Sequence, residues 1–433
     1  MSMRYLLILS CVLIFAGCKN NPSNSDDQEE QNLKQCIDGL SDGKYACENI
    51  DLLSNLPLEE LGEDQTIFDL WGWTDPSNGS EYAFLALSSK VIFIDLTEPT
   101  DPVLIGELPE SQLNVSTPKQ TNSDATDRSI KTYADHLFVV SDGQPHGMQV
   151  FDLANLRDYS GDYLTFTEDA LYEGAYNAHR IRIHEESGFA YLTGVQFGEQ
   201  CYQGGLHIVD INNPTSPSFS GCYDQESPAG NASYSDEYIY NVNCITYDGP
   251  DADYQNQEIC FTTKGDLLEV IDVTDKANPT LITHFNHSNY YLVDEIALSP
   301  SKRYLFTNDI EDELYMGQEP NTRIWDISDL DTVIYDRTFK YEGQATDLDI
   351  QTQGLLWHAS VGVSGFYIVD YSNIIFNNIQ VKGYFDTEFE KNCCRRDGGA
   401  ISSYSFSESG NIAIADFNKG FFLVEPQLDN TPE

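Results

Sequence analysis

The residues of this sequence with the chemistry to bind or transform a ligand stand where short apolar strands begin. They are acids, an arginine, a histidine and an amide: Asp127, Arg128, His179, Asn243, Asp294, Glu295, Asp347 and Asp349. Carboxylates brought close together can hold a hard cation such as Ca²⁺, or act as a general acid and a general base. We therefore take all eight as candidate ligand-binding residues. The candidate metal ligands among them are Asp294, Glu295, Asp347 and Asp349.

Other catalytic and binding motifs are absent. The eight histidines form no HExxH pattern, and the chain has no GxSxG, P-loop or GxGxxG motif after a strand. The acidic stretches 251–253 and 308–313 lack the EF-hand spacing, so we expect solvated turns there, with Ca²⁺ binding as the alternative. Motifs therefore give no support to a serine hydrolase or to a nucleotide-binding protein.

The elements that must position the candidate residues are strands of an internal repeat. The clearest copy is Leu206–Asp210, a nearly continuous apolar run that ends in an acid and is followed by prolines. Six further copies are found at separations of 44 to 62 residues: Val91–Asp95, Gln149–Asp152, Glu269–Asp272, Arg323–Asp326, Tyr367–Asp370 and Phe422–Glu425. Such runs are typical of strands packed on both faces. The terminal acids are expected to accept hydrogen bonds from the next turn rather than to be catalytic.

Each repeat reads as four strands. In the first repeat they are 66–73, 81–87, 91–95 and 103–108, and the same set recurs at 177–184, 188–194, 206–210 and 218–223. Seven repeats of four strands predict an all-β fold, a seven-bladed β-propeller of four-stranded antiparallel blades. The last repeat has three strands only, so we expect Glu48–Leu53 to pair beside Gly420–Glu425 and close the ring.

This architecture brings the candidate residues together. The innermost strands of a propeller begin around the mouth of a central channel, where convergent polar groups form a ligand site. We expect acids from at least three blades to meet there with His179 and with Arg128, which would offset one acid. A channel lined by polar residues and filled with water is the alternative.

The chain is strongly acidic, with 70 acids against 23 bases and a net charge of −47. A chain of this charge repels phosphate backbones, so nucleic acid is excluded as a partner. The charge serves solubility in saline surroundings or attracts cations or a basic partner, and the sequence leaves both open.

The N-terminus carries an export signal. Residues 1–17 contain Arg4, an apolar run and the small residues Ala16-Gly17 directly before Cys18, as in a bacterial lipoprotein signal peptide. We expect cleavage and lipidation at Cys18, with ordinary secretion as the alternative. Residues 18–35 are then an acidic disordered tether, 36–428 the propeller and 429–433 a tail. The protein is expected at the bacterial cell envelope, touching the membrane through this lipid alone.

Eight cysteines remain after Cys11 and Cys18 are set aside, and an even number in an exported chain indicates disulfides. Neighbours in sequence suggest the pairs Cys36–Cys47, Cys201–Cys222, Cys244–Cys260 and Cys393–Cys394. Sequence alone leaves the connectivity open. The spacing of a zinc site is absent.

Several stretches resemble the choice-of-anchor B family of exported proteins. They include Tyr45–Leu53, Trp71–Pro76, His146–Asp152, Gly249–Tyr254 and Gly383–Thr387, and the repeats resemble the LVIVD repeat. The resemblance spans roughly residues 36 to 427 and implies a propeller, export and a membrane anchor, but no established enzymatic activity. Family members carry histidine at the start of several inner strands, where this chain keeps His179 and elsewhere has carboxylates and amides. Carboxylates favour Ca²⁺ over Zn²⁺.

Two functions remain open. The first is a non-catalytic, surface-tethered binding or scaffold module, a monomer that contacts a protein or glycan. The second is a hydrolase or lyase that uses the channel acids with a divalent cation. An enzyme of this kind needs one carboxyl with a raised pKa in a partly apolar pocket.

Overall fold

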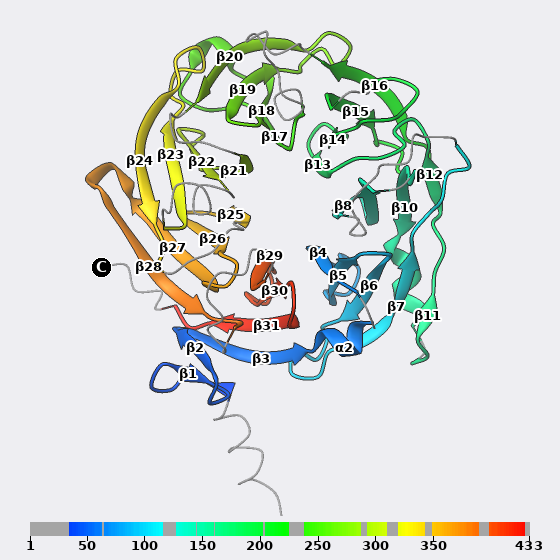
Figure 1. Ribbon diagram of the computed structural model, residues 1–433, viewed down its shortest axis with the longest axis vertical. Helices are drawn as coiled ribbons and strands as arrows, with labels where there is room; N and C mark the ends of the chain where they lie inside the picture. The colour runs from blue at the N-terminus through cyan, green and yellow to red at the C-terminus, as the bar shows by residue number, and fades with distance from the viewer. Residues whose placement is uncertain are drawn as a thin grey trace, which may run out of the picture.

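The computed structural model describes residues 34–62, 65–115, 127–143, 145–159, 161–201, 204–224, 238–286, 292–309, 319–342, 349–388 and 398–428. Within these residues the strands form seven sheets, arranged as a ring around a central axis (Figure 1). This confirms the predicted seven-bladed β-propeller. We number the blades in chain order, beginning at Ile67.

Each blade runs by antiparallel pairing from an innermost strand to an outer strand. Blade one contains β4 (Ile67–Thr74), β5 (Glu81–Leu87), β6 (Lys90–Asp95) and β7 (Val103–Pro109). Blade two contains β8 (Arg128–Tyr133), β9 (His136–Ser141), β10 (Met148–Asp152) and β12 (Ala170–Tyr172). Blade three contains β13 (Arg180–His184), β14 (Phe189–Thr193), β15 (Leu206–Asp210) and β16 (Ser218–Tyr223). Blade four contains β17 (Asn241–Thr246), β18 (Glu258–Lys264), β19 (Leu267–Asp272) and β20 (Thr280–Asn286). Blade five contains β21 (Val293–Leu298), β22 (Tyr304–Asp309), β23 (Asn321–Asp326) and β24 (Ile334–Lys340). Blade six contains β25 (Asp349–Gln353), β26 (Leu356–Ser360), β27 (Phe366–Asn373) and β28 (Asn378–Phe385). Blade seven contains β29 (Ala400–Ser405), β30 (Ile412–Asp416), β31 (Gly420–Pro426) and β3 (Ile50–Leu56).

The acid that ends each repeated strand forms a turn. In six blades its carboxylate accepts a hydrogen bond, at 2.8–2.9 Å, from the backbone N–H two residues later; the acids are Asp95, Asp152, Asp210, Asp272, Asp326 and Asp370. In five of these blades the third strand ends at the acid, and the local bond starts the connection to the fourth strand; in blade six β27 continues to Asn373. The prediction that these acids are turn formers is confirmed.

A β-bulge recurs beside that turn. In six blades the register between the third and fourth strands shifts just before the residue that precedes the acid, as at Phe93/Ile94 and Ile208/Val209. A bulge increases the right-handed twist of a strand pair. The outer strand therefore turns away from the inner strand in the same manner in each of these blades.

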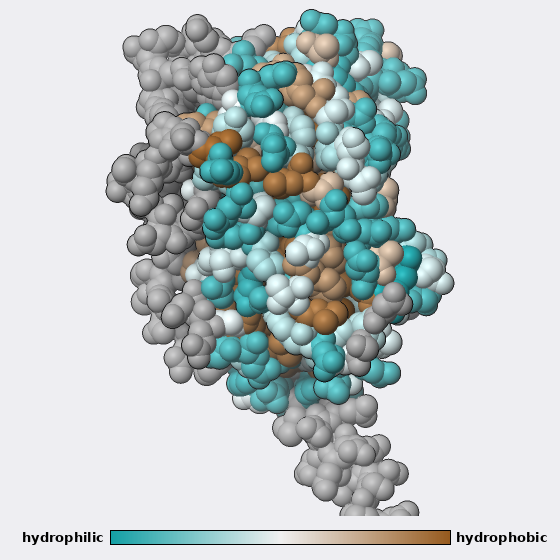
Figure 2. Space-filling view, turned by 90° about the vertical axis from the view of Figure 1, so that its right-hand side faces the viewer, coloured by the Kyte–Doolittle hydropathy of each residue, from teal (hydrophilic) through white to brown (hydrophobic). Residues whose placement is uncertain are grey.

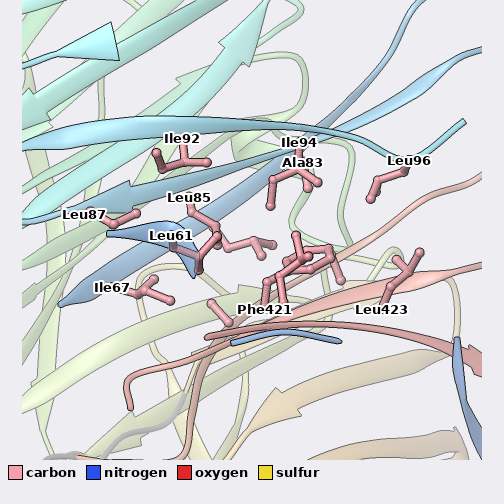
Figure 3. Packing of buried hydrophobic residues seen from close by; sticks show 14 of the residues in the cluster. Leu61, Ile67, Ala83, Leu85, Leu87, Ile92, Ile94, Leu96, Phe421 and Leu423 are labelled. Atoms are coloured by element: carbon pink, nitrogen blue, oxygen red, sulfur yellow. The ribbon is translucent and has the colours of Figure 1, made fainter. Parts of the chain in front are cut away.

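The apolar core lies between neighbouring blades. Seven buried clusters occur among the described residues, one at each blade–blade interface. Figure 3 shows the cluster where blade one meets blade seven, with Leu85 and Ile92 packed near Phe421 and Leu423. Each central strand is buried on both faces because it has a blade on either side.

The N-terminal segment closes the ring, as predicted, but with different bounds. The closing strand is β3, and it pairs antiparallel with β31 from Ile50↔Pro426 to Leu56↔Phe421. Glu48, which was expected in this strand, belongs instead to β2 (Tyr45–Glu48), which pairs with β28 of blade six. Asn49 separates the two strands with a φ of 55°, a left-handed conformation that breaks an extended strand.

Short strands also cover the outer edges of blades one and six. β11 (Leu164–Thr165) pairs parallel with β7, and β1 (Leu40–Ser41) pairs with β2 outside β28. Covering an outer strand leaves fewer unpaired backbone groups for contacts with other chains. Elsewhere the outer side of the ring around β7, β10 and β12 is largely hydrophilic, with small apolar areas (Figure 2).

Three of the four suggested disulfides are present: Cys36–Cys47, Cys201–Cys222 and Cys244–Cys260, with Cα–Cα distances of 5.9, 5.4 and 4.0 Å. Disulfides persist in oxidising compartments, so they indicate an extracellular or periplasmic location. Cys393 and Cys394 lie outside the described residues, as do residues 1–33, including Cys18, and the tail 429–433. The part of the chain with a described structure has no helix long and apolar enough to cross a membrane.

Leu52→Ala tests the contribution of the closing strand to stability. Leu52 is 4% exposed and packs in the cluster between blades six and seven. We expect the free energy of unfolding to fall by about 2–4 kcal/mol, since a buried leucine is replaced by a cavity. Urea denaturation measures this loss. The matched control is Val381→Ala on the outer strand β28, 40% exposed, with an expected change below about 0.5 kcal/mol. Similar losses in the two variants would contradict a stabilising role for β3.

Candidate functional site

A cavity of about 360 Å³ lies at the centre of the ring. All seven innermost strands contribute to its wall, from β4 in blade one to β29 in blade seven. Its polar side chains include Asp69, Lys131, Arg180, Arg182, Asn243, Asp294, Glu295, Asp349, Gln351 and Ser402. Side chains alternate along a strand, so every second residue of each inner strand points to this cavity.

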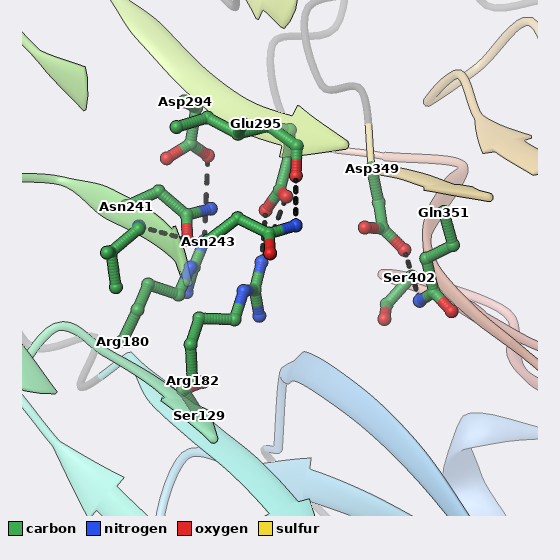
Figure 4. A network of polar contacts seen from close by, with 12 residues as sticks. Ser129, Arg180, Arg182, Asn241, Asn243, Asp294, Glu295, Asp349, Gln351 and Ser402 are labelled. Carbon is green, nitrogen blue, oxygen red and sulfur yellow. Dashed lines mark hydrogen bonds and ion pairs between the residues drawn. The ribbon is translucent and has the colours of Figure 1, made fainter. Parts of the chain in front are cut away.

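Two arginines of blade three reach acids of blade five (Figure 4). Arg182 Nη2 donates to both carboxylate oxygens of Glu295, at 2.9 and 3.2 Å. Arg180 Nη2 lies 3.6 Å from Asp294 Oδ2. Both arginines come from one strand, β13, where Ile181 separates them and points into the core. The two ion pairs therefore cross the cavity side by side.

A third ion pair joins blades one and two. Lys131 Nζ lies 3.5 Å from Asp69 Oδ2, which also accepts hydrogen bonds from Ser129 Oγ and the Ile130 N–H. Burial alone would raise the pKa of Asp69, but the charges of Lys131 and Arg180 and the Ile130 N–H hold it below its usual value. Burial lowers the pKa of Lys131 to about 8, although Asp69 opposes the shift. Lys131 also lies 3.9 Å from the centre of the Trp71 ring.

Two further acids of the wall, Glu295 and Asp349, have raised pKa values. Burial raises the pKa of Glu295 to about 8 although Arg182 opposes it, and Asp349 and Asp294 add to the shift. Burial also raises the pKa of Asp349, again opposed by Arg182. Asp349 Oδ2 accepts hydrogen bonds from the Ser403 N–H at 3.1 Å and from Gln351 Nε2 at 3.2 Å. Each of the three bases of the wall thus contacts a different acid, and Asp349, the remaining buried acid, accepts hydrogen bonds from neutral donors.

Two buried polar atoms near the cavity have no hydrogen-bond partner among the described residues: Asp294 Oδ1 and Asn241 Nδ2. Asp294 is 5% exposed and Asn241 1%. A buried polar atom without a partner costs about 1–3 kcal/mol. A bound group, water included, could supply the missing hydrogen bonds.

A second cluster stands beside the cavity, where β8 and β13 begin. Ligand atoms of Asp127, Asp142 and His179 lie within 4.8 Å of one another, and His179 Nδ1 is 3.2 Å from Asp142 Oδ2. The ring centres of Tyr238 and Tyr240 lie 5.9 and 5.8 Å from that of His179. Burial and the charge of Asp142 raise the pKa of Asp127, and His179 opposes the shift.

The candidate residues fall into four groups. Asn243, Asp294, Glu295 and Asp349 line the cavity, whereas Asp127 and His179 lie in the second cluster. Asp347 lies outside the described residues.

Arg128 points away from the cavity and joins blades one and two. It donates from Nη2 to Glu110 at 2.6 Å and from Nε to the Ser88 carbonyl at 3.1 Å, and its Nη1 lies 2.8 Å from His146 Nε2. The cations that offset the cavity acids are instead Lys131, Arg180 and Arg182.

The sequence reasoning missed these three cations and Asp69. It took the first residues of each inner strand, whereas the cavity is lined by alternate residues along the whole strand. The signal was present in Arg180-Ile181-Arg182, where two charges flank an apolar residue with the period of a strand. Period-two charges on an inner strand indicate positions that face a channel.

Comparison with known proteins gives one match. The family model for the LVIVD repeat matches residues 201–225, which contain β15 and β16 of blade three. None of the curated proteins matches the chain. The chain is therefore a seven-bladed β-propeller that carries an LVIVD repeat.

Proposed function

We propose that this protein is a lipid-anchored, non-catalytic binding module of the bacterial cell envelope, with the central cavity as its ligand site. The observation that carries the proposal is a set of fixed, paired acids and bases in a cavity of ligand size. Small-molecule sites begin at about 300 Å³ and combine a few fixed polar groups with a rigid frame. The seven blades provide such a frame, because each inner strand is held by the rest of its blade.

The anchor is a lipid on Cys18, which follows Ala16-Gly17 as in a lipoprotein signal peptide; the resemblance to the choice-of-anchor B family implies only that the protein is anchored. The acidic tether of residues 18–35 would hold the propeller away from the membrane. A fully extended chain spans about 3.3–3.6 Å per residue, so this tether reaches tens of ångströms. The partner is a soluble or surface-bound protein or glycan that presents a small polar group to the cavity.

Cys18→Ala tests the anchor. We expect the wild-type protein in the membrane fraction and the variant in the soluble extracytoplasmic fraction, because the acyl chains are the proposed membrane contact. Fractionation followed by immunoblotting measures the distribution. Cys11→Ala, inside the expected signal peptide, is the control and should leave the mature protein on the membrane. A Cys18→Ala protein that stays membrane-bound would remove the lipid anchor from the proposal.

Trp71 tests whether ligands enter the cavity, because it lines the wall while Trp73, Trp325 and Trp357 are buried. We expect a ligand to change tryptophan emission in the wild-type protein and to give a much smaller change in Trp71→Phe. Calorimetry on both proteins should show nearly equal affinity. The contrary result is binding in calorimetry that Arg182→Ala does not weaken and that leaves the emission of Trp71 unchanged. That result would place the ligand outside the cavity.

A second candidate function is acid–base catalysis in the same cavity. The observation that favours it is the separation of two carboxyl pKa values, with Asp69 lowered and Glu295 raised to about 8. A protonated acid beside an ionised one is the arrangement of many hydrolases and lyases. Hydrolysis of chromogenic glycosides by the wild-type protein, reduced about a hundredfold or more in Glu295→Gln, would favour this enzyme over the binding module.

Glu295→Gln also tests the pKa itself. A native Glu295 keeps its proton up to about pH 8, whereas an unfolded chain releases it near pH 4.3, roughly the usual value for glutamate. The stability due to this proton is therefore present at low pH and lost as the pH rises from about 4.5 to 8. We expect the free energy of unfolding to fall between pH 5 and pH 8 by on the order of 1–4 kcal/mol more in the wild-type protein than in the variant.

Urea denaturation at the two pH values measures this difference. Burial lowers the pKa of His146, His207 and His358, which gives the opposite dependence, but they are present in both proteins and cancel. Glu185→Gln, at an exposed carboxyl on the cavity wall, is the control and should behave as the wild type. Equal pH dependence in wild-type protein and Glu295→Gln would contradict a raised pKa.

A further inference from the structure

We infer that the ligand of the central cavity is uncharged and polyhydroxylated, a carbohydrate unit that places one hydroxyl between Asn241 and Asp294. This rests on the proposed binding function and adds the chemical class of the ligand. The inference is carried by two features: the cations of the cavity wall are already paired, and two buried polar atoms of the inner strands β17 and β21 lack partners.

The pairing of charges disfavours a charged ligand. The three bases of the wall are each bonded to a different acid: Lys131 to Asp69, Arg180 to Asp294 and Arg182 to Glu295. An anionic ligand would have to displace one of these acids, and a cationic ligand one of the bases. Removing the acid from Lys131 or Arg180 leaves a buried charge uncompensated, which is strongly unfavourable. Arg182 would lose both of its hydrogen bonds to Glu295, and it also interacts with the carboxyl of Asp349. A neutral ligand leaves all three pairs intact.

The unpartnered atoms define what the ligand must offer. Asn241 Oδ1 accepts the Val242 N–H at 2.9 Å, which fixes the amide and leaves Nδ2 as a donor without an acceptor. Asp294 Oδ2 faces Arg180, and Oδ1 is an acceptor without a donor. Both residues stand near the start of neighbouring inner strands, β17 and β21, and Figure 4 draws them in one network. A hydroxyl group donates and accepts at once, so a single hydroxyl placed between the two side chains would satisfy both atoms.

The rest of the wall suits further hydroxyl groups. Arg182 uses only Nη2 in its bond to Glu295, and a guanidinium has five N–H donors. Gln351 and Ser402 add neutral polar groups from blades six and seven, and Trp71 adds an apolar ring. A volume of about 360 Å³ is at the small end of ligand sites, which suits one or two sugar rings or the end of a glycan chain.

Two sets of three matched sugars test the charge preference. Galactose, galacturonate and galactosamine share a ring shape and differ in charge, as do glucose, glucuronate and glucosamine. We expect calorimetry and Trp71 emission on the mature-length chain to show binding of a neutral member, with its acid and amine at least about tenfold weaker, a difference of about 1.4 kcal/mol. The disaccharides lactose and cellobiose complete the panel.

Asn241→Ala and Asp294→Asn test the hydroxyl position. Each removes one bond to the ligand, so we expect about tenfold weaker binding of the preferred sugar in both. Asp253→Asn, at an exposed residue of the short 3-10 helix Ala252–Tyr254, is the matched control and should keep the wild-type affinity. Thermal melts and circular dichroism establish that each variant is folded. For a misfolded Asp294→Asn, methylation or deoxygenation of single hydroxyls on the sugar provides the same test, with one position expected to lose binding.

The outcomes separate the ligand class from the function. Equal or tighter binding of the uronate or the amino sugar at Trp71 would overturn the inference and leave the binding function in place. Absence of binding by every neutral sugar would overturn it as well, with water as the group that Asn241 and Asp294 hold. Conversion of a bound sugar to product would keep the ligand class but overturn the non-catalytic function.

Discussion

Closure of the ring is the constraint on which the rest of the structure depends. A blade buries its apolar faces only against its two neighbours, and seven clusters lie at seven interfaces. An open ring would expose one face of blade one and one of blade seven. Pairing of β3 with β31 removes that opening by joining the two ends of the chain in one sheet. The central cavity exists only because this closure holds seven inner strands around one axis.

Local sequence predicts the fold well because each repeat contains the residues that define its own strands and turns. The apolar strand, the acid at its end and the turn that follows are readable without any long-range information, and the Asp–N–H bond in six blades has the expected form. The limits of the closing strand were less predictable. A single residue, Asn49 in a left-handed conformation, divides one apparent strand into β2 and β3, and asparagine adopts that conformation only in some contexts.

The site was harder to predict than the fold, because its electrostatics depend on which side chains meet across the ring. Arg182 and Glu295 are 113 residues apart in sequence, and nothing local relates them. Sequence reasoning expected crowded acids in need of a cation, whereas the described residues bring three bases to the same cavity. Arg128 was expected there, yet its side chain leaves the inner strand toward Glu110 and His146. A strand places its residues on alternate sides, so a shift of one position changes which environment a charge enters.

The distribution of bases argues for recognition at the centre. The chain has only 23 bases for 70 acids, yet three of these bases line the cavity, where burial disfavours the charged form of a side chain. Buried ion pairs add little stability compared with apolar residues of similar volume, so their presence is better explained by a requirement for polar groups in fixed positions. Glu295, Asp349 and Lys131 have shifted pKa values because the cavity is shielded from water. The same shielding strengthens each hydrogen bond to a ligand. A rigid cavity in which every base is already paired is therefore suited to select a ligand by the positions of its hydroxyl groups, while the acidic charge of the chain keeps the propeller apart from other acidic surfaces.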